Sequence, residues 1–316
     1  MVDVSIIVVA HNDEADLPLS LASSAAQTGV SIETILVDNA PNDRSREIAA
    51  SRVPPVHVVA LAENVGFAAG MNRGIEASSG RYVLALNPDC RLAPDFAAVL
   101  AACLDARADA GSASGRVFRA QGPQLAATDR LDSTGLYFTS SGRHFDRDSG
   151  EPAAGRSLSD AEIFGASGAA GFYRREALEA AKISTGYFDA DFFLYREDAD
   201  LAWRLQRLGW KCLYVPGAIA YHRRRNLPER RRSMTAAANM HSVKNRFLLR
   251  INNQTLGQFA ATCLPTLARD LVVLGASLTV ERSSLPAFSW LWRNRKRLWA
   301  KRREIREKIR SRPRRP

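Results

Sequence analysis

The chain has 316 residues, of which 46% are hydrophobic and 24% are charged, enough for one large α/β domain with an appended segment. Its net charge of +11 is concentrated at one end: residues 282–316 hold fourteen Lys or Arg and two acids, which leaves 30 basic and 31 acidic residues elsewhere. The near-neutral body argues against a nucleic-acid-binding protein, and the basic end predicts contact with an anionic surface.

The first predicted element is the apolar run VSIIVVA at residues 4–10. Its length and its β-branched residues are typical of a strand buried on both faces of a parallel sheet. No basic region precedes the run and His11 ends it, so we expect a strand and not a signal peptide. Four cysteines lie far apart without a CxxC pair, which favours a reduced, cytoplasmic chain.

Strand and helix patterns then alternate four times, which predicts a doubly wound, mostly parallel sheet. The strands are expected at residues 4–10, 33–37, 56–61 and 82–86. Ligands bind such sheets beyond the carboxyl ends of the strands. The polar residues at these ends therefore form a candidate pocket, and they are Asn12, Asp38, Asn39, Asn87 and Asp89.

Two common nucleotide-binding motifs are missing from the sequence. The first strand is followed by AHNDEA instead of the GxGxxG of a dinucleotide-binding domain, and no GxxxxGK[ST] phosphate loop occurs. Gly66, Gly70 and Gly74 are spaced by four, which suits close backbone packing at a helix start but is weak evidence of function.

The segment from Glu197 to Leu208 carries leucines at helical spacing, so its acidic beginning lies in the first turn of an amphipathic helix. One interpretation is structural: the acids cap the helix, and Asp200 pairs with Arg204 one turn later. The other is catalytic, because the aromatic run FFLY at residues 192–195 predicts a partly dry site, where a carboxylate can act as a general base.

Residues 119–160 are rich in Gly, Ser, Asp and Arg and predict hairpins and loops. Farther on, the run from Thr255 to Val280 is apolar enough to suggest a membrane span. Pro265 and the Arg269-Asp270 pair interrupt it, and neither piece reaches the roughly 20 residues that a span requires. We therefore expect a pair of amphipathic helices on the domain or in the membrane interface.

The last segment places three tryptophans among basic residues. Trp290, Trp292 and Trp299 with their Lys and Arg neighbours suit the lipid headgroup layer, where each basic residue adds roughly 1 kcal/mol near an anionic surface. A solvated basic helix, a disordered tail and an RNA-binding tail are the alternatives, although the body has no nucleic-acid-binding module.

Seven blocks in order resemble the inverting family 2 glycosyltransferases, which have a GT-A fold, and most of all their rhamnosyltransferase group. The blocks cover about residues 2–225. They are VSIIVVAHN, ILVDNAPND, ENVGFAAGMNRGI, LNPD, GAAGFYRREAL, GYFDADFFLYREDADLAWRLQRLGW and VPGAIAYH.

The resemblance implies an α/β GT-A domain, doubly wound and Rossmann-like, in residues 1–232. Its nucleotide-sugar half would span about 1–118 and its acceptor half about 119–232. A helical extension would follow at 233–316, with an amphipathic, polybasic tail that associates with membranes.

The resemblance also implies roles for individual residues. Asp198 would be the general base, and Asp89 and His222 would hold Mg²⁺ or Mn²⁺. Nucleotide-sugar binding would fall to Ala10, His11, Asn12, Asp38, Asn39, Asn64, Gly66, Phe67, Asn72, Asn87 and Asp89. The acceptor would be bound, or the site supported, by Glu197, Asp200, Trp203, Arg204 and Gly168.

Three departures from the family pattern bear on these roles. The metal-binding DxD element reads Asn87-Pro88-Asp89, so one carboxylate is an amide and metal affinity is expected to be modest. Arg223–Arg225 stand where the family often has glycine and serine, and they could meet a diphosphate or a lipid phosphate. His11 replaces a common tyrosine, which leaves its contact with the base open.

The implied reaction is inverting transfer of L-rhamnose from dTDP-rhamnose to a polyprenyl-diphosphate-linked or growing cell-envelope glycan, at the cytoplasmic face of the membrane. A UDP-sugar donor, such as UDP-galactofuranose or another UDP-hexose, is the alternative. A non-catalytic, membrane-bound binder of glycan or nucleotide also stays open, although the presence of Asp89, Asp198 and His222 together argues against it. Oligomer contacts are expected, if anywhere, in the C-terminal helices.

Overall fold

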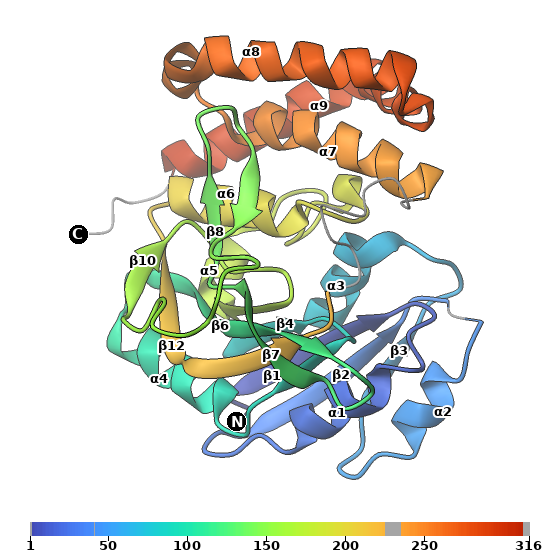
Figure 1. Cartoon of the computed structure of the whole chain (residues 1–316), viewed down its shortest axis with the longest axis vertical. Helices are drawn as coiled ribbons and strands as arrows, with labels where there is room; N and C mark the ends of the chain where they lie inside the picture. The colour runs from blue at the N-terminus through green and yellow to red at the C-terminus, as the bar shows by residue number, and fades with distance from the viewer. Residues whose placement is uncertain (1, 41, 225–234, 312–316) are drawn as a thin grey trace.

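The computed structural model describes residues 2–40, 42–224 and 235–311. Within them the chain forms a large mixed sheet, helices on both of its faces, and a group of long helices at one end of the molecule (Figure 1). Arg225 of the basic triplet and the basic residues after 311 lie outside the described residues.

The N-terminal half of the sheet is parallel, as the alternating pattern predicts. The register places Ala10 beside Asp38 and Val8 beside Leu86, so the residues that follow these strands share one edge of the sheet. In spatial order the strands are β3 (His57–Ala60), β2 (Ile32–Asp38), β1 (Val4–Ala10) and β4 (Tyr82–Leu86).

Side chains of β1 alternate between two hydrophobic clusters, one on each face of the sheet. Ile6 and Val8 pack on one face, and Ile7 and Val9 pack on the other. Burial on both faces explains why β1 reads as a continuous apolar run. The first face is covered by α1 (Leu17–Ala25), α2 (Ser45–Ala50) and α4 (Phe96–Ala106), and the second by α3 (Gly66–Glu76), α5 (Arg175–Ala181) and α6 (Glu197–Arg207).

The second half of the sheet mixes directions. β11 (Ala170–Arg174) is antiparallel to both β4 and β6 (Ala110–Gln121), whereas β12 (Lys211–His222) is parallel to β6 and antiparallel to β10 (Ala161–Ile163). The short β5 (Cys90–Leu92) pairs with the end of β12 and sets Cys90 opposite His222. This pairing brings the end of β12 to the turn that follows β4.

Two hairpins occupy the region predicted to hold hairpins and loops. β7 (Ala126–Ser133) folds back on β6, and β8 (Leu136–Phe138) pairs with β9 (His144–Asp146) in a separate two-stranded sheet. The prediction for residues 119–160 is therefore confirmed.

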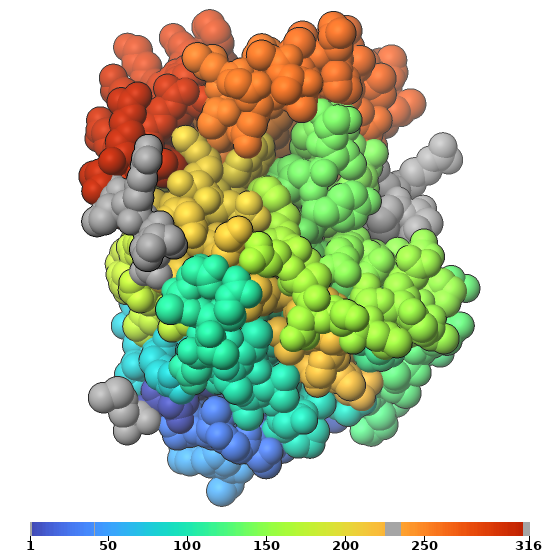
Figure 2. Space-filling view, turned by 90° about the vertical axis from the view of Figure 1, so that its left-hand side faces the viewer, coloured from blue at the N-terminus to red at the C-terminus, as the bar shows by residue number. Residues whose placement is uncertain are grey.

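Three helices, α7 (Ala236–Asn253), α8 (Leu256–Thr279) and α9 (Pro286–Ser311), lie together at the end of the molecule away from α1 and α2 (Figures 1 and 2). The prediction that Pro265 divides the apolar run is wrong, because α8 continues through it as one helix of 24 residues. Proline removes one backbone donor and the exposed helix tolerates the loss. By length and composition α8 is able to cross a membrane.

The basic C-terminal segment is largely a helix that packs on the protein. Leu298 and Ile305 of α9 are buried, and so is Lys301, which forms ion pairs with Asp189 and Asp191. These acids belong to the short turn that leads to α6. As far as Ser311, the tail is therefore joined to the turn before the helix that carries the predicted base.

Candidate active site at the carboxyl edge of the sheet

The ends of β1 and β2 form the first part of the site. Asp38 is fully buried; one carboxylate oxygen pairs with Arg46, and Oδ1 has no partner among the described residues. His11 Nδ1 lies 2.9 Å from the carbonyl oxygen of Asn39, whose side chain donates to Asn64 Oδ1 at 3.0 Å. A buried acceptor without a donor is costly, and a ligand's N–H or hydroxyl would satisfy it.

The start of α3 closes this edge. Gly66 has φ +82°, and a Cβ there would lie 2.5 Å from the ring of Phe193, so only glycine fits. Asn12 also has positive φ and accepts a hydrogen bond from the backbone N–H of Asn42 at 2.9 Å. Asn12 therefore shapes a turn at the rim, next to His11.

Two of the predicted nucleotide-sugar residues contact Phe188. The amide of Asn72 donates to the carbonyl oxygen of Phe188 at 2.8 Å and accepts from its backbone N–H at 2.9 Å. Phe67 packs edge-on against the ring of Phe188 with centroids 6.5 Å apart. Both side chains contact the turn before α6, so their assignment to the donor site stays a prediction.

Asp89, which follows β4, forms a buried pair with the imidazole of His222 at the end of β12. Asp89 Oδ1 lies 3.2 Å from His222 Nε2, while His222 Nδ1 lies 2.8 Å from Asp132 Oδ2. The two carboxylates outweigh the effect of burial and raise the pKa of His222 to about 10. Asn87 lies one turn away, where its backbone N–H donates to the carbonyl oxygen of Ala169.

These donors fit a hard divalent cation. Asp89 and His222 offer an oxygen and a nitrogen close together, a set that Mg²⁺ or Mn²⁺ accepts when diphosphate and water complete the coordination. Cys90 Sγ is near, but its thiol donates to the carbonyl oxygen of Ala169 at 3.2 Å, and burial raises its pKa well above the usual value. The imidazole of His222 would have to release its Nε2 proton to a base or to solvent when a cation binds, and the cation would take the place of that proton between Nε2 and Asp89.

Two carboxylates that the sequence did not single out connect this pair to the rest of the site. Arg224 Nε lies 2.7 Å from Asp132 Oδ1, and Arg224 Nη2 lies 2.5 Å from Asp146 Oδ2. Arg223 forms an ion pair of 2.6 Å with the buried Asp16. The described arginines of the basic triplet are thus already neutralised, which weakens the expectation that they clamp a phosphate.

Asp198 lies in the first turn of α6 and faces this cluster. Its Oδ2 accepts the backbone N–H of Gly168 at 2.9 Å, and Oδ1 accepts that of Ala199 at 2.7 Å. Burial, and then the negative charge of Asp146, raise the pKa of Asp198 to about 6. A carboxylate of this kind is ionised at neutral pH and has an affinity for protons suited to a general base.

The neighbouring Glu197 differs in character. It is buried, Oε2 has no partner among the described residues, and burial together with the charge of Asp198 raises its pKa to about 8. Glu197 is therefore mostly protonated at neutral pH. Of the two adjacent acids, Asp198 has the lower pKa and is the better candidate for an ionised carboxylate at neutral pH.

Asp200, Arg204 and Trp203 point into the protein and away from the cluster. The predicted pair exists, with 2.8 Å between Arg204 Nε and Asp200 Oδ2, and Asp200 also accepts hydrogen bonds from Asn252 and Asn253 of α7. Trp203 packs on Phe138, Phe164 and other apolar side chains. The predicted Asp200–Arg204 pair is confirmed, whereas the predicted capping by acids is wrong, because Arg196 is the N-cap residue and no side chain caps the helix. The contacts of these three residues support the fold.

A side chain from α7 holds the loop before Asp198. Phe193, Tyr195 and Arg196 all have positive φ, which non-glycine residues rarely adopt. The amide of the fully buried Asn245 lies within 2.9 Å of the carbonyl oxygens of Phe192, Leu194 and Tyr195. No motif marks Asn245 in the sequence, where it is one polar residue on a helix.

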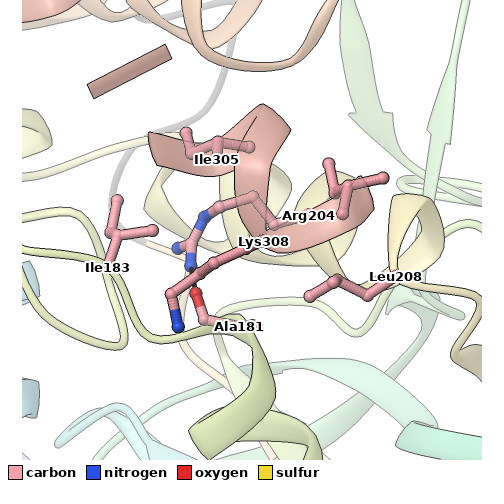
Figure 3. A pocket seen from close by; sticks show the side chains of 7 residues that line it. Ala181, Ile183, Arg204, Leu208, Ile305 and Lys308 are labelled. Atoms are coloured by element: carbon pink, nitrogen blue, oxygen red, sulfur yellow. Dashed lines mark hydrogen bonds between the residues drawn. The ribbon is translucent and has the colours of Figure 1, made fainter. Parts of the chain in front are cut away.

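Two cavities differ sharply in size and chemistry. The one at the contact of α6 and α9 has about 10 Å³, room for one water molecule, and Figure 3 shows Arg204, Ile183 and Ile305 around it. The other has about 360 Å³ and includes Arg224 in its wall, so it adjoins the Asp132–His222 pair. It is lined by Arg119, Ala120, Gln121, Thr128, Asp129, Arg130 and Arg224.

Part of the amino-acid sequence is similar to those of known bacterial proteins. N-acetylglucosaminyl-diphospho-decaprenol L-rhamnosyltransferase of Mycobacterium tuberculosis (strain ATCC 25618 / H37Rv) is 26% identical over 69% of this chain and 75% of its own length. Succinoglycan biosynthesis protein ExoO of Rhizobium meliloti (strain 1021) is 34% identical, but the match spans only 29% of this chain and 27% of ExoO.

Solved structures share the fold. TarS 1–349 of S. aureus in complex with UDP-GlcNAc gives a TM-score of 0.57 at 17% identity, with 97% of this chain and 88% of that chain covered. GalNAc-T7 with UDP, GalNAc and Mn²⁺ gives a TM-score of 0.60 at 15% identity, with 80% of this chain and 48% of that chain covered.

The family model described as glycosyl transferase family 2 matches residues 5–181, more than half of the chain. The matched part holds β1 to β4, Asp89 and Gly168, and the structural neighbours share its α/β GT-A architecture. The protein is therefore a glycosyltransferase and belongs to glycosyl transferase family 2.

Proposed function

We propose that this protein is an inverting transferase that moves a sugar, L-rhamnose from dTDP-rhamnose in our preferred case, to a polyprenyl-diphosphate-linked or growing cell-envelope glycan. The observation that carries the proposal is the continuous chain of contacts from Asp89 through His222, Asp132 and Arg224 to Asp146, whose charge acts on Asp198. It joins a leaving-group site and a base in one buried cluster.

Asp198 serves as the general base. Its carboxylate removes the proton from the acceptor hydroxyl as that oxygen attacks the anomeric carbon and the bond to the nucleoside diphosphate breaks. A single in-line displacement inverts the anomeric carbon. The hydrogen bond from Gly168 fixes one carboxylate oxygen, and the raised pKa near 6 keeps a useful affinity for the proton.

Asp89 and His222 hold a divalent metal, Mg²⁺ or Mn²⁺, and Asp132 orients the imidazole through Nδ1. When bound, the metal neutralises charge that develops on the departing diphosphate. The solved neighbour GalNAc-T7, which contains Mn²⁺, supports a divalent cofactor.

The donor is bound at the ends of β1 and β2. Asp38 Oδ1 accepts a hydrogen bond from the base or ribose, and His11, Asn39 and Asn64 form the adjoining wall. Similarity to the M. tuberculosis rhamnosyltransferase supports a rhamnose donor. A UDP-sugar is the second candidate, because TarS binds UDP-GlcNAc on the same fold.

The acceptor is lipid-linked, and the protein works as a peripheral protein on the cytoplasmic membrane face. The cavity of about 360 Å³ lies next to the catalytic cluster, and its Arg119 and Arg130, only loosely paired with Asp132 and Asp129 at 3.9 and 3.8 Å, are the cationic side chains that a diphosphate would meet. Exposed basic residues of α9 supply attraction to anionic lipid.

One experiment separates these options. A thermal-shift panel of dTDP, UDP and GDP, each with and without Mn²⁺, should raise the melting temperature most for the cognate base, and only fully with metal. The same purified protein should then release sugar from the cognate donor. Binding without any hydrolysis or transfer would support a non-catalytic binder.

A further inference from the structure

Helix α8 is amphipathic, but its polar face is turned toward the protein and its apolar face is exposed. Its buried residues are the polar Thr266 and Ser277, and its half-buried Asp270 forms ion pairs with Arg246 and Arg250 of α7. Surface helices of water-soluble proteins turn an apolar stripe inward and a polar stripe outward. Here the polar stripe faces the protein.

The outward face of α8 is apolar along its whole length. The side chains of Leu264, Leu267 and Leu271 are 78%, 50% and 70% exposed. The other exposed large apolar residues of this region are Leu256, Phe259, Val272, Leu274, Leu278 and Val280. A continuous patch of this size marks an interaction surface and is not explained by chance exposure.

We propose that this face of α8 lies in the plane of a lipid bilayer and inserts its leucines into the hydrocarbon boundary. The inference goes beyond the proposed reaction and beyond the basic tail, because it assigns the apolar share of membrane binding to α8. In-plane helices of this type bury an apolar face about 5–10 Å into the boundary.

Charge selects the bilayer over a second copy of the chain. α8 and α9 lie at the same end of the molecule (Figure 2), and α9 exposes Arg293, Arg295, Lys296 and Arg303 together with the rings of Trp292 and Trp299. Two copies meeting through this end would bring those basic residues together. Anionic headgroups would instead pair with them, and tryptophan favours the headgroup layer.

The ion pairs select an in-plane helix over a spanning one. To cross the membrane, α8 would have to withdraw Asp270 from Arg246 and Arg250 and carry it, with Arg269, into hydrocarbon. Charged side chains at the bilayer centre are costly. Lying flat, α8 keeps these contacts and still buries its leucines.

The test is flotation of the full chain with vesicles of phosphatidylcholine alone or with anionic phosphatidylglycerol, at low and high salt. The triple variant Leu264→Gln, Leu267→Gln, Leu271→Gln should bind both vesicles about tenfold more weakly or worse, including at high salt. The variant Arg293→Gln, Lys296→Gln, Arg303→Gln should lose only the salt-sensitive binding to anionic vesicles.

Controls keep the result interpretable. Val53→Gln with Leu158→Gln removes two exposed apolar residues, 91% and 61% exposed, away from α8 and should change nothing. The replaced leucines are exposed, so the melting temperature should stay the same, and donor hydrolysis should persist whether or not the vesicles bind.

Unchanged vesicle binding in the leucine variant would overturn the proposal. So would a discrete wild-type dimer that the leucine variant converts to monomer without any effect on vesicles, since α8 would then cover a second copy. If the wild-type protein does not hydrolyse any donor, the proposed function is wrong. The vesicle result for α8 does not depend on that outcome.

Discussion

Asp198 and Gly168 are joined by a hydrogen bond of 2.9 Å from the backbone N–H of the glycine to Oδ2 of the carboxylate. A Cβ at Gly168 would lie 3.0 Å from that oxygen, so the absence of a side chain lets the backbone approach. The contact leaves the carboxylate fixed at the start of α6 and oriented for proton transfer.

Asp198→Asn should lower turnover by about 10²-fold or more, because the amide cannot take the acceptor proton. Nucleotide affinity should stay near that of the wild type. Glu197→Gln is the matched control: Glu197 is mostly protonated at neutral pH, so a neutral amide should preserve activity. Activity lost in Glu197→Gln and kept in Asp198→Asn would move the base to Glu197.

Turnover should also depend on pH in a defined way. Asp198 must be ionised to act, so kcat/KM should rise with pH through about 6 and level off above it. Asp146 and Arg196 are the charged neighbours of the carboxylate, and Glu197 is a titratable neighbour that is mostly neutral below pH 8. Asp146→Asn removes a negative charge and should shift the rising limb to lower pH. A limb that stays near pH 4 in the wild type would contradict the raised pKa.

Asp89→Ala should weaken metal-dependent binding of the nucleoside diphosphate, and EDTA should have the same effect on the wild type. Asp132→Asn should lower metal affinity by about 10- to 100-fold, because the carboxylate of Asp132 orients the imidazole of His222 through Nδ1. Isothermal titration with Mn²⁺ measures both effects directly. Wild-type transfer at full rate in EDTA would exclude the metal.

Much of this arrangement follows from the sequence and some of it does not. β1, β2 and β4 follow from apolar runs of strand length, and Asp38 and Asp89 from their positions at strand ends. Asp132 and Asp146 do not, because hairpins of irregular composition bring them to His222 and Arg224 without any repeating pattern. The contacts of Phe67 and Asn72 with Phe188 do not follow from the sequence either, because helical periodicity does not show which neighbour a helix faces.

Asn245→Ala should lower kcat by roughly tenfold, because three carbonyl oxygens of the strained loop lose their donor and Asp198 shifts. The affinity for nucleotide should not change. Asn294→Ala on α9 is the control, because that amide donates to the carbonyl oxygen of Trp290 and accepts from Arg297, both on the same helix. A lower melting temperature with kcat and its pH profile unaltered would make Asn245 purely structural.

Lys301→Ala should reduce the free energy of unfolding by about 3–5 kcal/mol, because it leaves the buried carboxylate of Asp189 unpaired. Lys296→Ala, exposed on the same helix, should change it little. Urea denaturation compares the two. Equal stability of the two variants would show that the ion pair of Lys301 does not tie α9 to the folded domain.

The most direct test of the central claim is the stereochemistry of the product. Purified protein with the cognate donor, a divalent metal and a polyprenyl-diphosphate-linked acceptor should form a glycosidic bond whose anomeric configuration, read by NMR, is opposite to that of the donor. Asp198 as base in a single displacement requires this inversion. A product with retained configuration would contradict the account.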